Sequence, residues 1–377
     1  MKIAIPAETD PAEPRVAATP DTVKRMVGMG AEVAVEKGAG ERAGILDKDF
    51  QGAGAKVASG KDTVAGADIV LKVRRPSKAE LTGYKPGTIV IAIMDPFGNE
   101  AALAEMAGAK ISAFAMELMP RITRAQGMDV LSSQANLAGY RAVIDAAAEY
   151  GRALPMMMTA AGTVPAARAF IMGAGVAGLQ AIATVRRLGA VVTATDVRPA
   201  AKEQVESLGA KFVAVEDEEF KQAETAAGYA KEMSKEYQAK QAALVAAHIA
   251  KQDIVITTAL IPGRPAPKLV SKAMVESMKP GSVIVDLAVE RGGNCELAEP
   301  DKVVVHNGVK VVGFLNMPGR LAATSSALYA KNLVAFLDVL VKEKKLNVPW
   351  EDEIVKATLL TRDGAVVHPN FKPKGAA

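Results

Sequence analysis

Three glycines within residues 169–178, which read AFIMGAGVAG, have the spacing of a phosphate-binding turn. They follow a short apolar run, and a helical stretch begins at the turn. The first glycine allows a tight turn, the second lets the backbone approach a pyrophosphate, and the third lets the helix pack on the sheet. Free N–H groups at the start of that helix favour the negative charge of a pyrophosphate. The residues predicted to bind it are Gly173, Gly175, Val176, Ala177 and Gly178.

An acidic residue, Asp196, ends the next apolar run at residues 190–195. Its carboxylate would accept hydrogen bonds from the ribose hydroxyls of a dinucleotide and would repel a 2′-phosphate, which favours NAD(H) over NADP(H). Arg198 lies two residues further and would weaken this preference. The alternative is a glycine-rich turn without a ligand, but strand, turn, helix, strand and acid stand in the required order. The predicted cofactor-binding residues at this strand end are Asp196, which would hold the ribose, Val197 and Arg198.

Short apolar runs separated by helical stretches predict an α/β fold with two Rossmann-like domains and parallel sheets. We expect the NAD-binding domain over residues 133–324. Six candidate strands match the full count of a doubly wound dinucleotide fold. They lie at 169–172, 191–195, 211–215, 253–257, 283–287 and 311–313.

A first, discontinuous domain is expected over residues 1–132 and 325–377. Its helix after Thr19 has a plausible N-cap in that threonine and Pro20 at the first helical position. Apolar residues at helical spacing predict a connecting helix at 132–152 and a return helix at 328–341. The candidate strands of this domain are residues 2–6, 31–35, 68–73, 88–94 and 110–114.

Composition narrows the function classes. The net charge of +4 over 377 residues is small and mixed, without the basic block of a nucleic-acid-binding protein. The single Cys295 excludes an internal disulfide framework, and the three histidines show no metal-ligand spacing. The N-terminus does not resemble a signal peptide, and no segment has the pattern of a membrane span. We therefore expect a cytoplasmic protein without a bound metal.

Two segments are ambiguous. Residues 216–241 are rich in Glu, Lys, Gln and Ala, and fit either a solvated surface helix or a mobile flap with Gly228 as its hinge and Tyr229 as its lid residue. Three methionines follow each other at 156–158, and the simplest expectation for them is buried packing.

Residues 116–134, which read MELMPRITRAQGMDVLSSQ, resemble a signature of the NAD(H)-binding component (domain I) of proton-translocating nicotinamide nucleotide transhydrogenases. Alanine dehydrogenases form the related branch. The resemblance extends over nearly the whole chain through further blocks. These are residues 15–17, 158–164, 286–288, 292–293 and 332–333.

The resemblance implies roles for several residues. Arg121, Gln126, Asp129 and Ser132 would lie in a loop beside the nicotinamide, whose carboxamide such side chains can orient. The alternative for this loop is a polar cap on the following helix, made by Asp129 or Ser132. The further residues that match nucleotide contacts of the family are Gly228, Tyr229 and Leu260.

The resemblance also implies a partner. NADP(H) would be held by another domain, and hydride would pass directly between the two nicotinamides. The chain has one glycine fingerprint followed by an acid, so we expect it to be inactive alone in NAD–NADP exchange. It ends without a membrane span, as a separately encoded subunit of the alpha-1 type would. We expect a homodimer docked through a membrane-spanning partner on the cytoplasmic face, and no nucleic acid.

The alternative is an alanine dehydrogenase-like enzyme that acts on a small substrate. Arg15 and Lys72 match two of its substrate-binding residues, but Ile91–Pro96 lacks the expected histidine. Glu290 stands near the place of a later aspartate. Without the imidazole, proton exchange at the substrate near neutral pH is difficult. Arg15 and Lys72 would then be remnants or charges that line a cleft.

Overall fold

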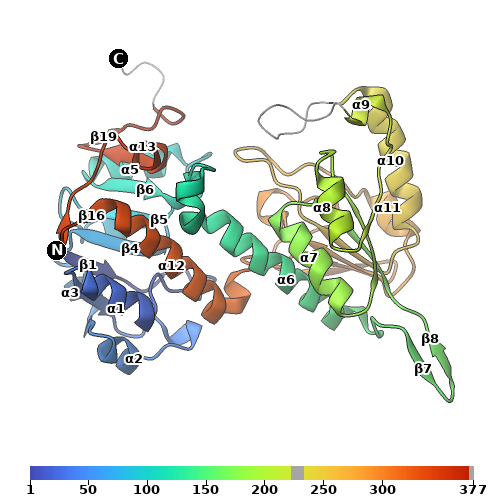
Figure 1. Ribbon diagram of the computed structural model, residues 1–377, viewed down its shortest axis with the longest axis horizontal. Coiled ribbons are helices and arrows are strands. Elements are labelled where there is room, and N and C mark those ends of the chain that lie inside the picture. The colour runs from blue at the N-terminus through green and yellow to red at the C-terminus, as the bar shows by residue number, and fades with distance from the viewer. Residues whose placement is uncertain (222–232, 373–377) are drawn as a thin grey trace. The chain divides into compact units, whose positions relative to one another are not determined.

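The computed structural model describes residues 1–221 and 233–372 (Figure 1). The chain divides into two compact units. Unit 1 comprises Met1–Gln134 and Pro318–Ala377, and unit 2 comprises Ala135–Met317. The boundary at Gln134 falls inside the long helix α6, Val130–Tyr150.

Unit 1 is built on an eight-stranded sheet with the order β19-β18-β6-β5-β4-β1-β2-β3. Its strands β1 to β6 pair in parallel; the sequence analysis predicted five of them and missed β3. Strand β18 pairs antiparallel with β6 and with β19. The strands are β1 (Lys2–Ile5), β2 (Glu32–Glu36), β3 (Lys56–Ala58), β4 (Ile69–Arg74), β5 (Ile89–Ile93), β6 (Ser112–Ala115), β18 (Leu359–Arg362) and β19 (Ala365–Val366).

Helices cover both faces of this sheet because its strands are apolar on both sides. Helices α1, α2 and α12 contribute to one buried cluster, and α3 and α5 contribute to the other. The predicted cap of α1 is confirmed, since Thr19 accepts a hydrogen bond from the backbone N–H of Thr22. The α-helices are α1 (Pro20–Gly28), α2 (Asp47–Gly52), α3 (Gly60–Val64), α4 (Lys78–Leu81), α5 (Glu100–Gly108), α12 (Ala322–Leu340) and α13 (Glu353–Thr358).

Short turns of helix and one small hairpin complete unit 1. The chain leaves β6 through η2 (Met116–Leu118) and η3 (Thr123–Met128) before α6 begins. Two more 3-10 turns are η1 (Glu41–Ala43) and η5 (Gly319–Leu321). The hairpin pairs β16 (Val341–Lys342) with β17 (Lys345–Leu346).

Unit 2 is built on a seven-stranded sheet with the order β11-β10-β9-β12-β13-β15-β14. Six strands pair in parallel and match the six predicted runs, although β11 is shorter than expected. The strands are β9 (Arg168–Met172), β10 (Val191–Thr195), β11 (Lys211–Phe212), β12 (Ile254–Thr257), β13 (Val283–Asp286), β14 (Val303–His306) and β15 (Val309–Val312).

The prediction missed β14, which runs antiparallel to β15 at the edge of the sheet. Asn307 and Gly308 join the two strands, and both have positive φ, at 48° and 76°. An Asn-Gly pair between two apolar runs is the usual signal of a two-residue hairpin. The sequence therefore carried enough information to predict this strand.

Helices cover both faces of the sheet in unit 2. One buried cluster combines strand residues with α6, α7 and α8, and the other combines them with α10 and α11. The helices after α6 are α7 (Val176–Arg187), α8 (Ala201–Ser207), α9 (Glu218–Lys221), α10 (Lys235–Ile249) and α11 (Lys272–Ser277), with the short turn η4 (Val289–Arg291).

The expected buried packing of the three methionines is wrong. Met156, Met157 and Met158 are 64%, 41% and 80% exposed. They lead into a hairpin of β7 (Met157–Thr159) and β8 (Gly162–Val164) that projects from unit 2 (Figure 1). Because β7 and β8 pair only with each other among the described strands, the methionines have no sheet to pack against.

Among the described residues, none of the helices combines the length and apolar character that crossing a membrane requires. The same portion of the chain holds no group of three or more His, Cys, Asp or Glu side chains placed to bind a metal ion.

Candidate dinucleotide-binding site

The glycine turn of unit 2 joins β9 to α7 where the sheet order changes direction. Strands β10 and β12 flank β9, so the turn lies at the switch point where doubly wound sheets bind ligands. Gly173 has φ of 105°, and a Cβ there would lie 2.4 Å from Oγ1 of Thr258. At Gly178 a Cβ would lie 1.8 Å from the carbonyl oxygen of Gly173. Both positions therefore require glycine for the fold itself.

Gly175 is different. Its φ is −78°, and a Cβ there would meet no described heavy atom within 4 Å. It is the N-cap of α7, so the free N–H groups of the first turn start at this point. The open space next to N–H donors and a partial positive charge fits a pyrophosphate. The backbone of Val176 and Ala177, in that first turn, belongs to the same surface.

The carboxylate of Asp196 is already saturated with donors. Its Oδ2 accepts from the N–H of Ala174 at 2.8 Å and from Nη2 of Arg198 at 3.1 Å. Its Oδ1 accepts from the backbone N–H and Nε of Arg198 at 2.9 and 3.0 Å. A carboxylate offers about four acceptor positions. A ribose diol at Asp196 therefore requires the guanidinium of Arg198 to release two of them.

Exposed apolar side chains surround the carboxyl ends of β9, β10 and β12. Val176 is 40% exposed, Val197 57% and Leu260 52%. Each follows one of three adjacent strands. Apolar groups with few polar neighbours suit the flat faces of a dinucleotide.

Two residues that sequence reasoning missed hold this end of the sheet in place. Thr258 donates from Oγ1 to the carbonyl oxygen of Gly173 at 3.1 Å. Asn294, fully buried, accepts from the N–H of Ala259 at 3.0 Å and donates to the carbonyls of Ala259 and Pro267, both at 2.9 Å. One amide thus braces both ends of the exposed segment that carries Leu260. The glycine pair just before Asn294 was the available signal of a tight turn after a strand.

The ambiguous segment at 216–241 is partly helical. Helix α9 lies near its beginning, and helix α10 starts near its end. Gln241 of α10 donates to Oγ1 of Thr195 at 3.2 Å, at the carboxyl end of β10. Gly228 and Tyr229 lie outside the described residues.

In unit 1, the four polar residues of the signature segment lie between Arg121, just before η3, and Ser132, in the first turn of α6. Arg121 and Gln126 are exposed. Asp129 precedes α6 and accepts from the N–H of Ser132 at 2.9 Å and from its hydroxyl at 2.5 Å. Asp129 therefore caps the helix, which the alternative interpretation of this loop proposed. Capping and a contact with a ligand are compatible, because the exposed Gln126 takes no part in the cap.

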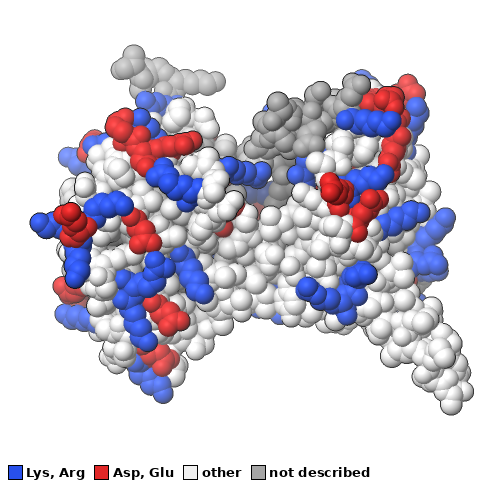
Figure 2. Space-filling model, viewed as in Figure 1, with Lys and Arg blue, Asp and Glu red and all other residues white. Residues whose placement is uncertain are grey.

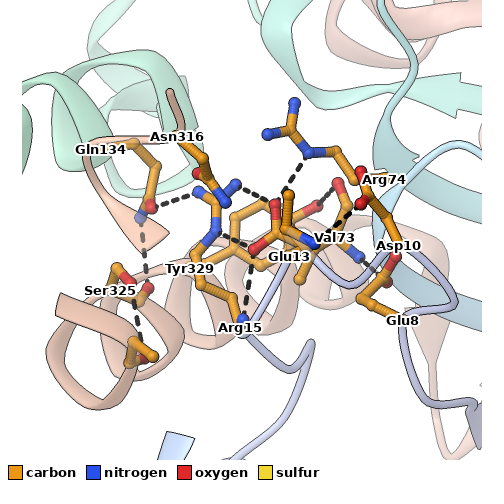
Figure 3. A network of polar contacts seen from close by, with 12 residues as sticks. Glu8, Asp10, Glu13, Arg15, Val73, Arg74, Gln134, Asn316, Ser325 and Tyr329 are labelled. Atoms are coloured by element: carbon orange, nitrogen blue, oxygen red, sulfur yellow. Dashed lines mark hydrogen bonds and ion pairs between the residues drawn. The ribbon is translucent and has the colours of Figure 1, made fainter. Parts of the chain in front are cut away.

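Arg15 belongs to the network of polar contacts drawn in Figure 3, and both Arg15 and Lys72 are buried. Arg15 donates to both carboxylate oxygens of Glu13, at 2.7 and 2.6 Å, and to Oε1 of Gln134 at 2.7 Å. The ammonium of Lys72 lies 2.7 Å from Oε1 of Glu80 and 3.3 Å from Oε2 of Glu8. Each of these cations is thus paired with a carboxylate of the chain itself.

The pKa shifts in this network follow from burial and pairing. Burial raises the pKa of Glu13, but the guanidinium groups of Arg15 and Arg74 outweigh it and hold the pKa below its usual value. Glu8 has a raised pKa, because burial outweighs the attraction of Lys72. Removing any one member would leave a charge without its partner in the interior.

The position that lacks the histidine of alanine dehydrogenases follows β5. There the N–H groups of Met94 and Asp95 donate to the carboxylate of Glu117. Burial raises the pKa of Glu117 to about 6, against these hydrogen bonds. Glu290, near the expected aspartate, accepts from the backbone N–H of Asn316 at 2.7 Å. Both carboxylates therefore hold backbone turns.

The sequence and the fold of this chain are similar to those of known proteins. Models of the alanine dehydrogenase/PNT N-terminal and C-terminal domains match residues 4–138 and 142–369. An NAD(P) transhydrogenase alpha subunit of Rhodospirillum rubrum is 57% identical over 100% of both chains. The crystal structure of transhydrogenase from Sinorhizobium meliloti is similar at 64% identity and a TM-score of 0.90, over 97% of this chain and 100% of that one.

Alanine dehydrogenases are more distant. That of Halomonas elongata is 29% identical over 98% of this chain and 95% of its own. The much higher identity to the Rhodospirillum rubrum transhydrogenase subunit extends over the full length of the chain. The chain therefore belongs to the alanine dehydrogenase/PNT family, and within it to the transhydrogenase alpha subunits.

Proposed function

We propose that this chain is the NAD(H)-binding subunit of a proton-translocating NAD(P) transhydrogenase. The observation that carries the proposal is the open glycine turn at the switch point of unit 2, with Asp196 at the end of the neighbouring strand. The high identity to the Rhodospirillum rubrum transhydrogenase subunit supports it.

Unit 2 supplies the nucleotide-binding residues of the proposal. The turn from Gly173 to Gly178, including Val176 and Ala177, holds the pyrophosphate, and Asp196, Val197 and Arg198 hold the adenosine ribose. Leu260 contacts the nucleotide beside β12. Gly228 and Tyr229, which match nucleotide contacts of the family, lie outside the described residues. NAD(H) is favoured because the negative charge of Asp196 repels a 2′-phosphate.

Unit 1 supplies the residues that orient the nicotinamide. The exposed side chains of Gln126 and Arg121 offer an amide and a guanidinium to a carboxamide. Asp129 and Ser132 complete this set and fix the start of α6. When bound, the nicotinamide supplies the carbon that gives or accepts a hydride, and this transfer needs orientation rather than an acid or base.

The acceptor comes from another chain. The sequence has one glycine fingerprint followed by an acid, so NADP(H) is bound by a partner domain. A membrane-spanning partner carries the proton, and conformational change couples its translocation to hydride transfer. This chain then lies on the cytoplasmic face of the membrane through these partners.

The hairpin β7–β8 is the proposed contact surface for a second copy of this chain in a homodimer. Residues 153–167 contain no charged side chain, and this projecting arm is uncharged in Figure 2. A two-fold interface places the same surface against itself, and an uncharged apolar arm does so without repulsion. An isolated two-stranded hairpin is also marginally stable in water, so it gains from such a contact.

The test is reconstitution with a separately purified NADP(H)-binding domain of a transhydrogenase. We expect NADH to reduce a chromogenic NAD analogue rapidly when this domain and NADP are present, and very slowly when either is omitted. Gln126→Asn should slow the hydride step far more than it weakens NADH binding, because it shortens the side chain proposed to orient the ring. Equal losses in both would contradict that role.

The control reaction is NADH oxidation with pyruvate and ammonia. An alanine dehydrogenase would carry it out without any partner. We expect no turnover, because Arg15 and Lys72 are paired internally and Ile91–Pro96 contains no histidine. Turnover here, without transfer in the reconstituted system, would overturn the proposed function.

A further inference from the structure

A bidentate ion pair fixes the turn that carries Gln126. Nη1 of Arg124 lies 2.8 Å from Oδ2 of Asp352, and Nη2 lies 2.9 Å from Oδ1. Arg124 is in η3, and Asp352 is the N-cap of α13, where it also accepts from the N–H of Ile354 at 2.9 Å. The hydrogen bonds from Arg124 lower the pKa of Asp352, so the carboxylate stays ionised at neutral pH.

A second contact fixes the same turn on the other side of Gln126. The carbonyl oxygen of Gly127 accepts from Nδ2 of Asn332 at 2.8 Å. Asn332 lies in α12, is 7% exposed, and accepts from the hydroxyl of Ser133 through its Oδ1 at 2.7 Å. The side-chain amide of Asn332 thus links η3 and the start of α6 to α12.

Two apolar residues of η3 are buried, on either side of the exposed Gln126. Ala125 is 1% exposed and Met128 6% exposed, and both belong to the core of unit 1. Gln126 therefore stands between two buried residues, with the ion pair of Arg124 before it and the amide contact to Gly127 after it. Its side chain is exposed, while its neighbours at 124, 125, 127 and 128 are held by the ion pair, by the amide contact or by burial.

We propose that Arg124, Asp352 and Asn332 are positioning residues for hydride transfer, which set the direction of the Gln126 side chain. The inference rests on the proposed function, since it needs Gln126 to orient the nicotinamide. A planar guanidinium held by two parallel hydrogen bonds fixes orientation as well as distance. The side chain of Arg124 is 54% exposed, and pairs at such exposure add little to folding stability.

The experiment compares variants of the full chain in the reconstituted system with the NADP(H)-binding domain. Arg124→Met removes the guanidinium and both of its hydrogen bonds to Asp352. Asp352→Ser removes the ion pair while keeping an N-cap for α13. Arg124→Lys keeps the positive charge but lacks the two parallel donors of the guanidinium. The matched control is Arg25→Met, because Arg25 forms another exposed pair in unit 1, with Asp338 at 3.1 Å. Each variant is tested for single-turnover hydride transfer, for NADH binding by fluorescence, and for Tm.

We expect Arg124→Met and Asp352→Ser to slow hydride transfer about tenfold or more, because small displacements of an orienting group are costly. NADH affinity and Tm should stay close to those of Arg25→Met. The double variant should be no slower than the slower single one, because both remove the same contact. Arg124→Lys should not restore the rate.

Asn332→Ala tests the second contact, between Asn332 and the carbonyl of Gly127. We expect it too to slow hydride transfer much more than it weakens NADH binding. If Gln126→Asn is slow but the Arg124 and Asp352 variants transfer as fast as the control, the positioning inference is wrong and the proposed function stands. If Gln126→Asn itself is as fast as the wild type, the role of Gln126 fails, and the positioning inference fails with it. A loss of Tm that parallels the loss of rate would show that the ion pair of Arg124 and Asp352 stabilises the fold and does not position Gln126, which would overturn the inference.

Discussion

At the scale of single residues, the proposed choice between NADH and NADPH depends on Asp196 and Arg198. In the structure they pair with each other, and the carboxylate also holds the glycine turn through Ala174. A 2′-phosphate would meet a carboxylate and a guanidinium together. The proposed preference for NADH thus depends on the carboxylate keeping its charge, because the pair is neutral with that charge and would be positive, and so attract a 2′-phosphate, without it.

Asp196→Asn should therefore change specificity more than it changes the fold. We expect NADH binding to weaken about tenfold or more, since hydrogen bonds to charged groups are worth about 1.5–3 kcal/mol. NADPH binding should weaken less, because the repulsion disappears and Arg198 is released for the phosphate. Fluorescence titration with both nucleotides measures the ratio. The control is Asp301→Asn, an exposed aspartate of unit 2 with φ of 57° that asparagine tolerates. Parallel losses for both nucleotides would contradict the prediction.

At the scale of elements, the glycine turn separates folding from binding. Gly178 brings α7 against the carbonyl of Gly173, so its lack of a side chain is a packing requirement. A Cβ at Gly175 would meet no described heavy atom within 4 Å, so the described fold does not require glycine there. In the proposed function, the motif thus combines a structural glycine with a binding glycine, three residues apart.

Gly178→Ala should destabilise unit 2 by about 1–3 kcal/mol, as overpacking does, and should also abolish NADH binding. Gly175→Ala should leave the free energy of unfolding within about 0.5 kcal/mol of the wild type. It should still weaken NADH binding strongly, because the new Cβ occupies the path of the pyrophosphate. Denaturant unfolding and NADH titration of both variants check this. NADH binding of wild-type strength in Gly175→Ala would be the contrary result.

Elements also differed in how well the sequence predicted them. Most parallel strands of both sheets were predicted because they are short apolar runs with buried residues. The parallel strand β3 was missed, since it has one exposed and two half-buried residues. Residues 156–158 are also apolar, yet they are exposed. Their burial was wrongly predicted because a run of three methionines has no period that distinguishes a core strand from a projecting arm. Asp129 was ambiguous between cap and ligand for a similar reason, because the same polar side chain suits both.

At the scale of the whole molecule, the exposed hairpin bears on assembly. Met158→Glu should weaken the proposed dimer, because a carboxylate buried against an apolar partner surface is costly. Sedimentation at micromolar concentration should show a shift from dimer to monomer. Val305→Glu is the matched control, since Val305 is 64% exposed on β14 of the same unit. A monomeric wild type, or equal behaviour of the two variants, would rule out the hairpin as the contact.

The sequence by itself determined the nucleotide fingerprint, the two parallel sheets and the family signature. These features are local, because strand, glycine turn, helix and acid follow each other within about 30 residues. Only the tertiary structure decided which residues hold them in place. Thr258, Asn294 and Asp352 reach their partners from 27 to 228 positions away along the chain. Such contacts form only when the sheets and helices pack, so no local pattern of residues encodes them.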